Sequence, residues 1–131
     1  MSGNFVFVDS PSEFCDDAAL VVRLPRGLSS KQKLFAVLAD KLKFPRYFGW
    51  NWDALDECLR DLSWLPSGRR VIVVHESLPF FDLGNQRQIY LDVLRSRVEE
   101  TDINGHVFSA VFPSSLRDAV IQATTERRQS T

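Results

Sequence analysis

Three regularly spaced carboxylates have the residue type and spacing to take part in binding or catalysis. Asp53, Glu57 and Asp61 recur at every fourth position, on one face of an expected helix, with Asp56 and Arg60 beside them. Such a row can accept paired hydrogen bonds from arginine, as a phosphate does. Like charges at this spacing cost a helix about 0.2–0.5 kcal/mol per pair. The pattern therefore leaves two readings open, a surface for a basic partner or a solvated helix face.

A second group with chemical potential is His75-Glu76-Ser77, which follows the apolar run RVIVVH. Open α/β sheets place ligands at the carboxyl ends of their strands, so this is the most enzyme-like cluster in the chain. It comes without a glycine-rich phosphate loop, a nucleophile motif or a metal-ligand spacing. Cys58 has no histidine near it in sequence and is most simply a small buried side chain. We therefore expect no catalytic residue and no cofactor.

A metal site is a more distant alternative for the carboxylates. Asp53, Asp56 and Glu57 offer oxygen ligands of the kind that magnesium or calcium takes. That reading predicts a hydrolytic activity that a chelator abolishes. The two histidines stand apart in sequence and are poor evidence for zinc.

The helix that carries the carboxylates is defined by its apolar face and its start. Asn51 is expected to be the N-cap, with its side chain accepting a backbone N–H, and Gly49 to reverse the chain at positive φ. Four apolar residues then recur at the spacing of one helix face: Leu55, Cys58, Leu59 and Leu62. One side of this helix is predicted to be buried while the other is negative.

Residues 47–59, Tyr-Phe-Gly-Trp-Asn-Trp-Asp-Ala-Leu-Asp-Glu-Cys-Leu, resemble the signature of the barstar family, intracellular protein inhibitors of secreted ribonucleases. The two aromatics before the glycine, the Asn, the Asp-Ala-Leu and the Cys-Leu keep their mutual spacing. The resemblance extends over roughly residues 19–112. It implies a non-enzymatic α/β protein with a three-stranded parallel sheet packed against helices. It also implies a basic ribonuclease, bound one-to-one, as the partner.

In that family the turn aromatic and the helix carboxylates fill the basic, phosphate-binding active site of the nuclease. By matching position, the resemblance assigns partner contacts chiefly to five residues: Tyr47, Asn51, Asp53, Ala54 and Glu57. The wider predicted set adds Phe48, Gly49, Trp50, Trp52, Asp56 and Arg60. The chain departs from the best-known member at two positions, where Glu57 replaces Asp and Asp56 replaces an aromatic residue. An interaction module of the same fold with a non-ribonuclease partner remains the alternative.

The three tryptophans have competing readings as binding anchors or core residues. Trp is enriched at interface hot spots, so Trp50 is predicted to be exposed and Trp52 partly buried. Trp64, between Leu62 and Leu65, is predicted to lie in the core.

The order of short apolar runs and amphipathic segments predicts the architecture around this stretch. Strands are expected over residues 19–24, 70–75 and 106–112, and a run apolar on both faces suits a strand covered by helices on both sides. Helices are expected from Ser29 or Ser30 to about Leu42, from near Asn85 to Val98, and after Ser114 or Ser115. The last has a narrow stripe of Leu116, Ala119, Val120 and Ala123. Phe5–Val8 is either an added edge strand or an ordered arm, Phe80–Leu83 an apolar loop, and Asn104-Gly105 a turn.

Length and charge limit the remaining possibilities. The 131 residues are expected to form a single domain, residues 1–131. A net charge of −1 disfavours nucleic acid and anionic membranes as partners, and no apolar run approaches the length of a membrane span. The start of the chain has no signal-peptide pattern, and two cysteines, Cys15 and Cys58, fit a reducing cytoplasm. One bridge between them remains an open possibility.

Overall fold

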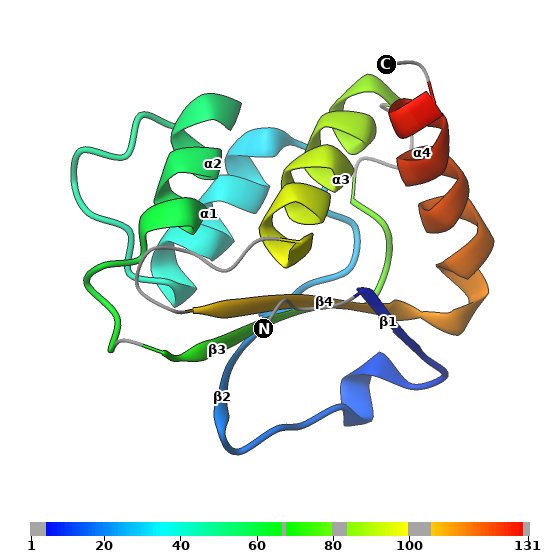
Figure 1. Ribbon diagram of the computed structural model, residues 1–131, viewed down its shortest axis with the longest axis horizontal. Helices are drawn as coiled ribbons and strands as arrows, with labels where there is room; N and C mark the ends of the chain where they lie inside the picture. The colour runs from blue at the N-terminus through cyan, green and yellow to red at the C-terminus, as the bar shows by residue number, and fades with distance from the viewer. Residues whose placement is uncertain (1–4, 67, 80–83, 100–105, 130–131) are drawn as a thin grey trace.

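A four-stranded, all-parallel sheet runs through the protein in the order β1-β4-β3-β2 (Figure 1). This computed structural model describes residues 5–66, 68–79, 84–99 and 106–129, with side chains up to residue 124. The strands are β1 (Phe5–Val8), β2 (Ala19–Leu24), β3 (Arg70–His75) and β4 (Val107–Pro113). The helices are α1 (Lys31–Lys41), α2 (Trp52–Asp61), α3 (Gly84–Glu99) and α4 (Arg117–Gln129), with short 3-10 turns η1 (Pro11–Glu13) and η2 (Ser114–Leu116). The predicted Phe80–Leu83 loop and Asn104-Gly105 turn lie outside the described residues.

The three predicted strands are confirmed as parallel neighbours. β2 and β3 have the expected bounds, and β3 pairs with β4 from Arg70–Val107 onward. β4 begins at Val107 rather than His106, and its last residue is Pro113. Phe5–Val8 is an edge strand, paired along β4 from Phe5–Ala110 to Val8–Pro113. The sheet therefore has one strand more than the three expected.

All four helices cover one face of the sheet, which corrects the expectation of helices on both sides (Figure 1). The other face carries a smaller apolar cluster of Ala19, Ile72, Val74 and Val111. Phe14, from the connection between β1 and β2, packs against that cluster. The Arg23 guanidinium donates to the carbonyls of Pro11 and Phe14, which ties η1 and its flanking residues to β2. A chain segment rather than a helix therefore shields this face.

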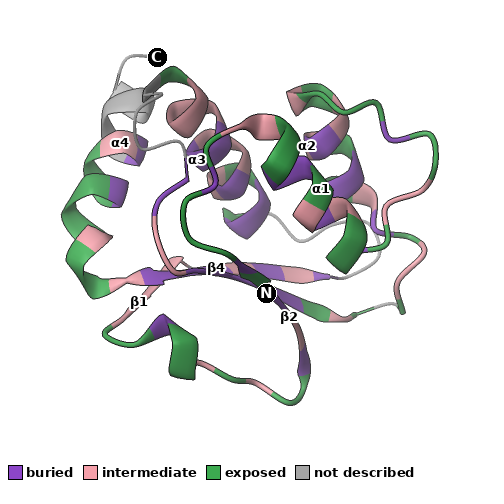
Figure 2. Cartoon of the chain, turned by 180° about the vertical axis from the view of Figure 1, so that it is seen from behind, coloured by how far each residue is buried: buried purple, intermediate pink, exposed green. Residues whose placement is uncertain are grey.

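The main core lies between the sheet and the helices, whose buried residues face inward (Figure 2). Ser30 caps α1 by accepting from Lys33 N, and the expected stripe of α1 is buried: Leu34, Phe35, Leu38 and Leu42. Tyr90, Leu91, Leu94 and Val98 form the buried side of α3. In α4 only part of the expected stripe is buried: Val120 is inaccessible, whereas Ala119 is exposed. Within the described ranges, no helix has the length and apolar composition needed to cross a membrane.

Candidate protein-binding site on α2

The start of α2 is built by Asn51, as the sequence predicts. Its Oδ1 accepts from Ala54 N at 2.8 Å, and its Nδ2 donates to Gly49 O at 3.3 Å. The positive φ expected at Gly49 lies instead at Trp50, whose φ is 54°. Space at Gly49 is tight, because a Cβ there would stand 3.3 Å from Asn51 Nδ2, which would have to shift slightly, and 3.5 Å from Ala54 Cβ. The turn therefore holds a bulky residue in a conformation that side chains disfavour.

The apolar face of α2 is buried as predicted. Leu55, Cys58, Leu59 and Leu62 are all at most 7% exposed. Burial raises the pKa of the Cys58 thiol, and the carboxylates of Asp61 and Glu57 raise it further. The thiol is therefore held neutral, which fits a core residue and not a nucleophile. Cys15 is exposed and both cysteines are free, so the possible bridge is not formed.

The opposite face of α2 carries the carboxylates. Asp53 and Glu57 are exposed, and neither makes a side-chain hydrogen bond or ion pair within the described part of the chain. Asp61 is half-buried and engaged in an interaction of its own. Across the described residues, no group of three His, Cys, Asp or Glu side chains is placed to hold a metal ion. The metal reading of Asp53, Asp56 and Glu57 therefore has no geometric support.

Asp56 is tied down inside the protein. Its Oδ2 accepts from Arg60 at 2.7 Å, and its Oδ1 lies 3.3 Å from Nε of Arg97 on α3. The Arg97 side chain is only 4% exposed and is withdrawn from water, whereas the Asp56 side chain is 27% exposed. Arg60, predicted with Asp56 as a partner contact, is the exposed member of the same group. Asp56 therefore joins α2 to α3, a role that no feature of the sequence indicates.

The aromatic residues before α2 divide into exposed and buried members. Tyr47 is 68% exposed and Trp50 is 48% exposed, as predicted for Trp50. Phe48 was expected to contact the partner, but its ring is 6% exposed and packs edge-on against Phe35 and Phe44. The turn directs this one ring into the core between α1 and α2. Phe48 thus anchors the loop that presents Tyr47 and Trp50.

Trp52 and Trp64 lie at the margin of the core. Trp52 is half-buried, as expected, and packs against Phe35 with ring centroids 5.1 Å apart. Its Nε1 donates to Gln86 Oε1 at 3.0 Å, which links the start of α2 to the start of α3. Trp64 was predicted to be core and is half-buried, with Nε1 donating to Leu42 O at 2.7 Å. Indole N–H groups need such partners when water is excluded.

A small hollow lies between the exposed loop and the acidic face. It measures about 200 Å³ and is lined by Tyr47, Phe48, Ala54, Glu57, Cys58 and Asp61. An aromatic ring and two carboxylates therefore surround one depression. This arrangement suits a cationic side chain, which an aromatic ring and carboxylates both attract.

In the cluster at the end of β3, His75 lies in the core, whereas Glu76 and Ser77 are half-buried. His75 is fully buried, with Nδ1 2.9 Å from Val111 O and Nε2 2.6 Å from the Tyr90 hydroxyl. Burial lowers the His75 pKa from 6.5 to about 4, against the opposing effect of the Val111 carbonyl. A carbonyl only accepts, so Nδ1 carries the proton and Nε2 accepts from Tyr90. His75 is therefore a neutral structural residue.

The fold and this site agree with one protein family. The model of the family described as Barstar (barnase inhibitor) matches residues 19–113, from the start of β2 to the end of β4. The chain belongs to the barstar family. Barstar-family proteins are inhibitors and not enzymes, and membership implies a barnase-like ribonuclease as the kind of partner. The chain shows no significant match to a curated protein or to a solved structure.

The barstar match covers the sheet core and the site on α2, but not the elements at either end. β1 and η1 precede it, and η2 and α4 follow it. These four elements are additions to the shared domain in this chain.

Proposed function

We propose that this protein inhibits a basic ribonuclease by placing the start of α2 and the loop before it in the enzyme's phosphate-binding cleft. The observation that carries the proposal is the state of Asp53 and Glu57. Both carboxylates are exposed, and neither has a partner within the described residues. Like charges held four residues apart oppose their own helix unless an outside cation neutralises them.

The exposed aromatics supply the apolar part of the same surface. Tyr47 lines the same hollow as Glu57, and the exposed Trp50 packs against the buried Phe48 ring, which anchors the loop. The hollow between Tyr47, Glu57 and Asp61 has room for one arginine or lysine side chain. A guanidinium there would face the Tyr47 ring and donate hydrogen bonds to the Glu57 carboxylate, as it does to a substrate phosphate.

The rigidity of α2 supports a preformed surface. Asp56 forms an ion pair with Arg97, without hydrogen-bond geometry at Arg97 Nε, and Trp52 Nε1 donates to Gln86, so two contacts hold α2 against α3. Because the helix that carries Asp53 and Glu57 is already held in place, less backbone freedom is lost on binding.

The test is calorimetric titration of the protein against barnase and against any ribonuclease encoded beside its gene, together with RNA-cleavage assays. We expect one-to-one inhibition that weakens as salt increases. Asp53→Ala and Glu57→Ala should each cost about 2–5 kcal/mol, because each leaves a cation of the enzyme buried without its partner. Circular dichroism confirms that the variants are folded.

Asp61→Ala is the matched control on the same helix. Its carboxylate lies farther along α2, at the rim, where an ion pair contributes about 0–1 kcal/mol. It should mainly slow association at low salt. If both Asp53→Ala and Glu57→Ala bind as tightly as the parent, the acidic face is merely solvated. If the parent leaves both ribonucleases fully active, the fold serves a different protein partner.

A further inference from the structure

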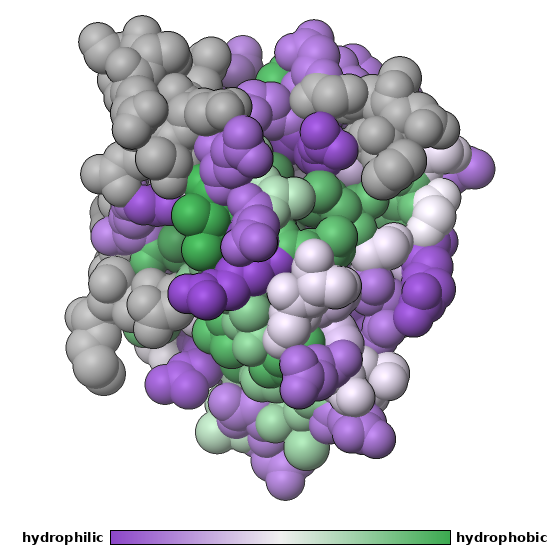
Figure 3. Space-filling model, turned by 90° about the vertical axis from the view of Figure 1, so that its right-hand side faces the viewer, coloured by the Kyte–Doolittle hydropathy of each residue, from purple (hydrophilic) through white to green (hydrophobic). Residues whose placement is uncertain are grey.

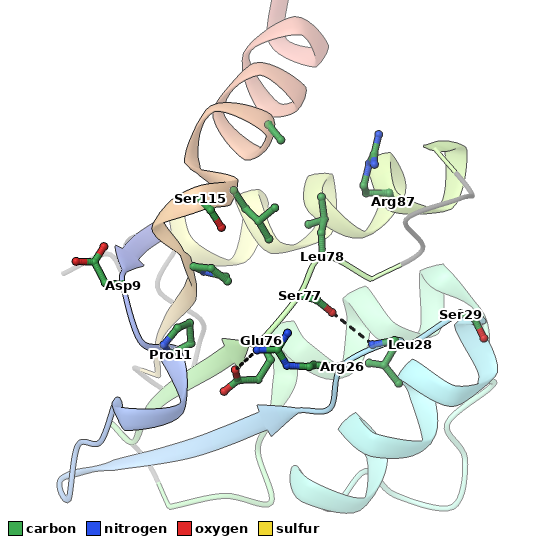
Figure 4. Close-up of a pocket in the computed structure, with 14 residues that line it drawn as sticks. Asp9, Pro11, Arg26, Leu28, Ser29, Glu76, Ser77, Leu78, Arg87 and Ser115 are labelled. Atoms are coloured by element: carbon green, nitrogen blue, oxygen red, sulfur yellow. Dashed lines mark hydrogen bonds and ion pairs between the residues drawn. The ribbon is translucent and has the colours of Figure 1, made fainter.

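A cleft of about 950 Å³ opens at the carboxyl ends of the strands (Figure 4). The segments after all four strands contribute to it: Pro11 after β1, Arg26 after β2, Glu76 after β3 and Ser115 after β4. Sites for small organic molecules typically enclose about 300–1,000 Å³. The cleft shares no residue with the site on α2.

The topology of the sheet explains why a cleft forms there. β1 and β4 are parallel neighbours, so both end at the same edge. After β1 the chain passes to the face that η1 shields, whereas after β4 it passes through η2 to the helical face (Figure 1). Neighbouring strands whose continuations leave toward opposite faces open a crevice between them, and α/β proteins bind ligands at such points.

The walls of the cleft are mainly apolar. Six apolar residues line it: Pro11, Leu28, Leu78, Pro113, Leu116 and Ala119. The view onto this end of the molecule shows apolar surface across the middle of the face, bordered by hydrophilic side chains (Figure 3). Contact with an apolar ligand would remove this surface from water.

The polar groups of the cleft are only loosely paired with one another. Arg26 Nη2 lies 3.7 Å from Glu76 Oε2, with the arginine side chain 77% exposed and the glutamate 21% exposed. Ser77 Oγ accepts from Gly27 N at 3.4 Å, near the upper limit for a hydrogen bond. The charges of the lining cancel, because Asp9 and Glu76 balance Arg26 and Arg87. The cleft thus has no net charge, and the Arg26–Glu76 pair places a donor group next to an acceptor group.

We propose that this cleft binds a short, uncharged peptide with apolar side chains. A peptide group carries a carbonyl that accepts and an N–H that donates, which complements Arg26 and Glu76 together. Since Arg26 is exposed, it can shift to admit the ligand without leaving a buried gap. The apolar side chains of the peptide then lie against Leu78, Leu116 and Ala119. A ligand with one full charge matches only half of the Arg26–Glu76 pair and leaves the other half unpaired.

The cleft is independent of the proposed inhibitor activity. Pro11, Ser115, Leu116 and Ala119 belong to β1–η1 and η2–α4 regions outside the barstar match at residues 19–113. The additions at the two ends of the chain therefore form one wall of this binding site together. A failure of the peptide proposal leaves the ribonuclease proposal untouched.

The test is an amide NMR titration of the full chain with acetyl-Leu-Ala-Leu-amide, up to about 1 mM. We expect saturable shifts at Gly27, Ser77 and Leu116, without shifts at Asp53 and Glu57. Decanoate and decylamine, which carry one charge each on an apolar chain, serve as comparison probes and should bind more weakly than the peptide.

Two variants test the assignment, with one matched control. Ala119→Phe fills the cleft and should abolish the shifts, whereas Ile121→Phe, on an exposed position of α4 outside the lining, should leave them unchanged. Glu76→Met keeps the bulk but removes the acceptor and should weaken peptide binding about tenfold. The amide spectra report whether each variant is folded. The proposal is overturned if the peptide gives no saturable shifts, if either charged probe binds more tightly, or if folded Ala119→Phe binds like the parent.

Discussion

The carboxylate of Asp56 is shared between two arginines, with Oδ2 2.7 Å from Arg60 on its own helix and Oδ1 3.3 Å from Arg97 on α3. Arg97 is almost completely enclosed, so its charge depends on partners inside the protein. Asp56 thus contacts a buried side chain of the protein, whereas Asp53 and Glu57 face solvent. Asp56 therefore anchors α2, whereas Asp53 and Glu57 are available to recognise a partner.

Asp56→Asn should lower the free energy of unfolding by about 2 kcal/mol, because it removes the charge that compensates a buried guanidinium. Chemical denaturation followed by circular dichroism measures the change. Glu57→Gln, on the exposed side of the same helix, is the control and should stay within about 0.5 kcal/mol of the parent. Equal stabilities for the two variants would show that the Asp56–Arg97 pair contributes nothing.

Asn51→Ala should destabilise the protein by about 1 kcal/mol, because the N–H of Ala54 loses its acceptor. The same variant should weaken ribonuclease binding, since the turn that holds Trp50 is bonded through Asn51 to Gly49. Asn51→Asp keeps an acceptor at the cap and should retain most of the stability. Denaturant midpoints that rank Asp with Ala, well below the parent, would contradict the capping role.

Lys43→Gly should raise the free energy of unfolding by about 0.5–1 kcal/mol. Lys43 is exposed with a φ of 58°, directly after the C-cap of α1, and Phe44 N bonds back to Ala39 O at 3.0 Å. This is a helix ending in which glycine is the preferred residue. Lys43→Ala keeps the Cβ and is the control, without the gain. Thermal unfolding that ranks Ala at or above Gly would contradict the strain.

The stability of the protein should fall as the pH drops from about 6.5 to about 4, owing to His75. Its pKa is about 4 in the folded protein and 6.5 ordinarily, so below pH 6.5 the unfolded chain binds a proton that the folded chain excludes. The loss amounts to about 3 kcal/mol and is complete near pH 4, where the folded state also titrates. Urea unfolding across this range should give a steeper pH dependence for the parent than for His75→Gln. Parallel curves would refute the assignment.

Periodicity was enough to predict the buried face of α2 and the three parallel strands, because burial repeats with the geometry of helix and strand. The resemblance pointed to the loop and the carboxylates. Three features depend on contacts between distant segments and left no local signal: the inward turn of Phe48, the positive φ of Trp50, and the Asp56–Arg97 pair. The cleft at the strand ends was equally hidden, because its walls come from the two ends of the chain.

The pairing of β1 with β4 has a consequence for how the chain is made. Phe5 leaves the ribosome long before its neighbour Ala110. β1 therefore has no partner strand while α1, α2 and α3 are synthesised. Closing so long a loop is entropically costly and slow, and it comes after the local contacts. β2 and β3 can pair earlier, whereas β1 cannot pair until β4 has been synthesised. During synthesis, therefore, the segment from Phe5 to Val8 is an unpaired apolar strand that nascent-chain chaperones have the opportunity to bind.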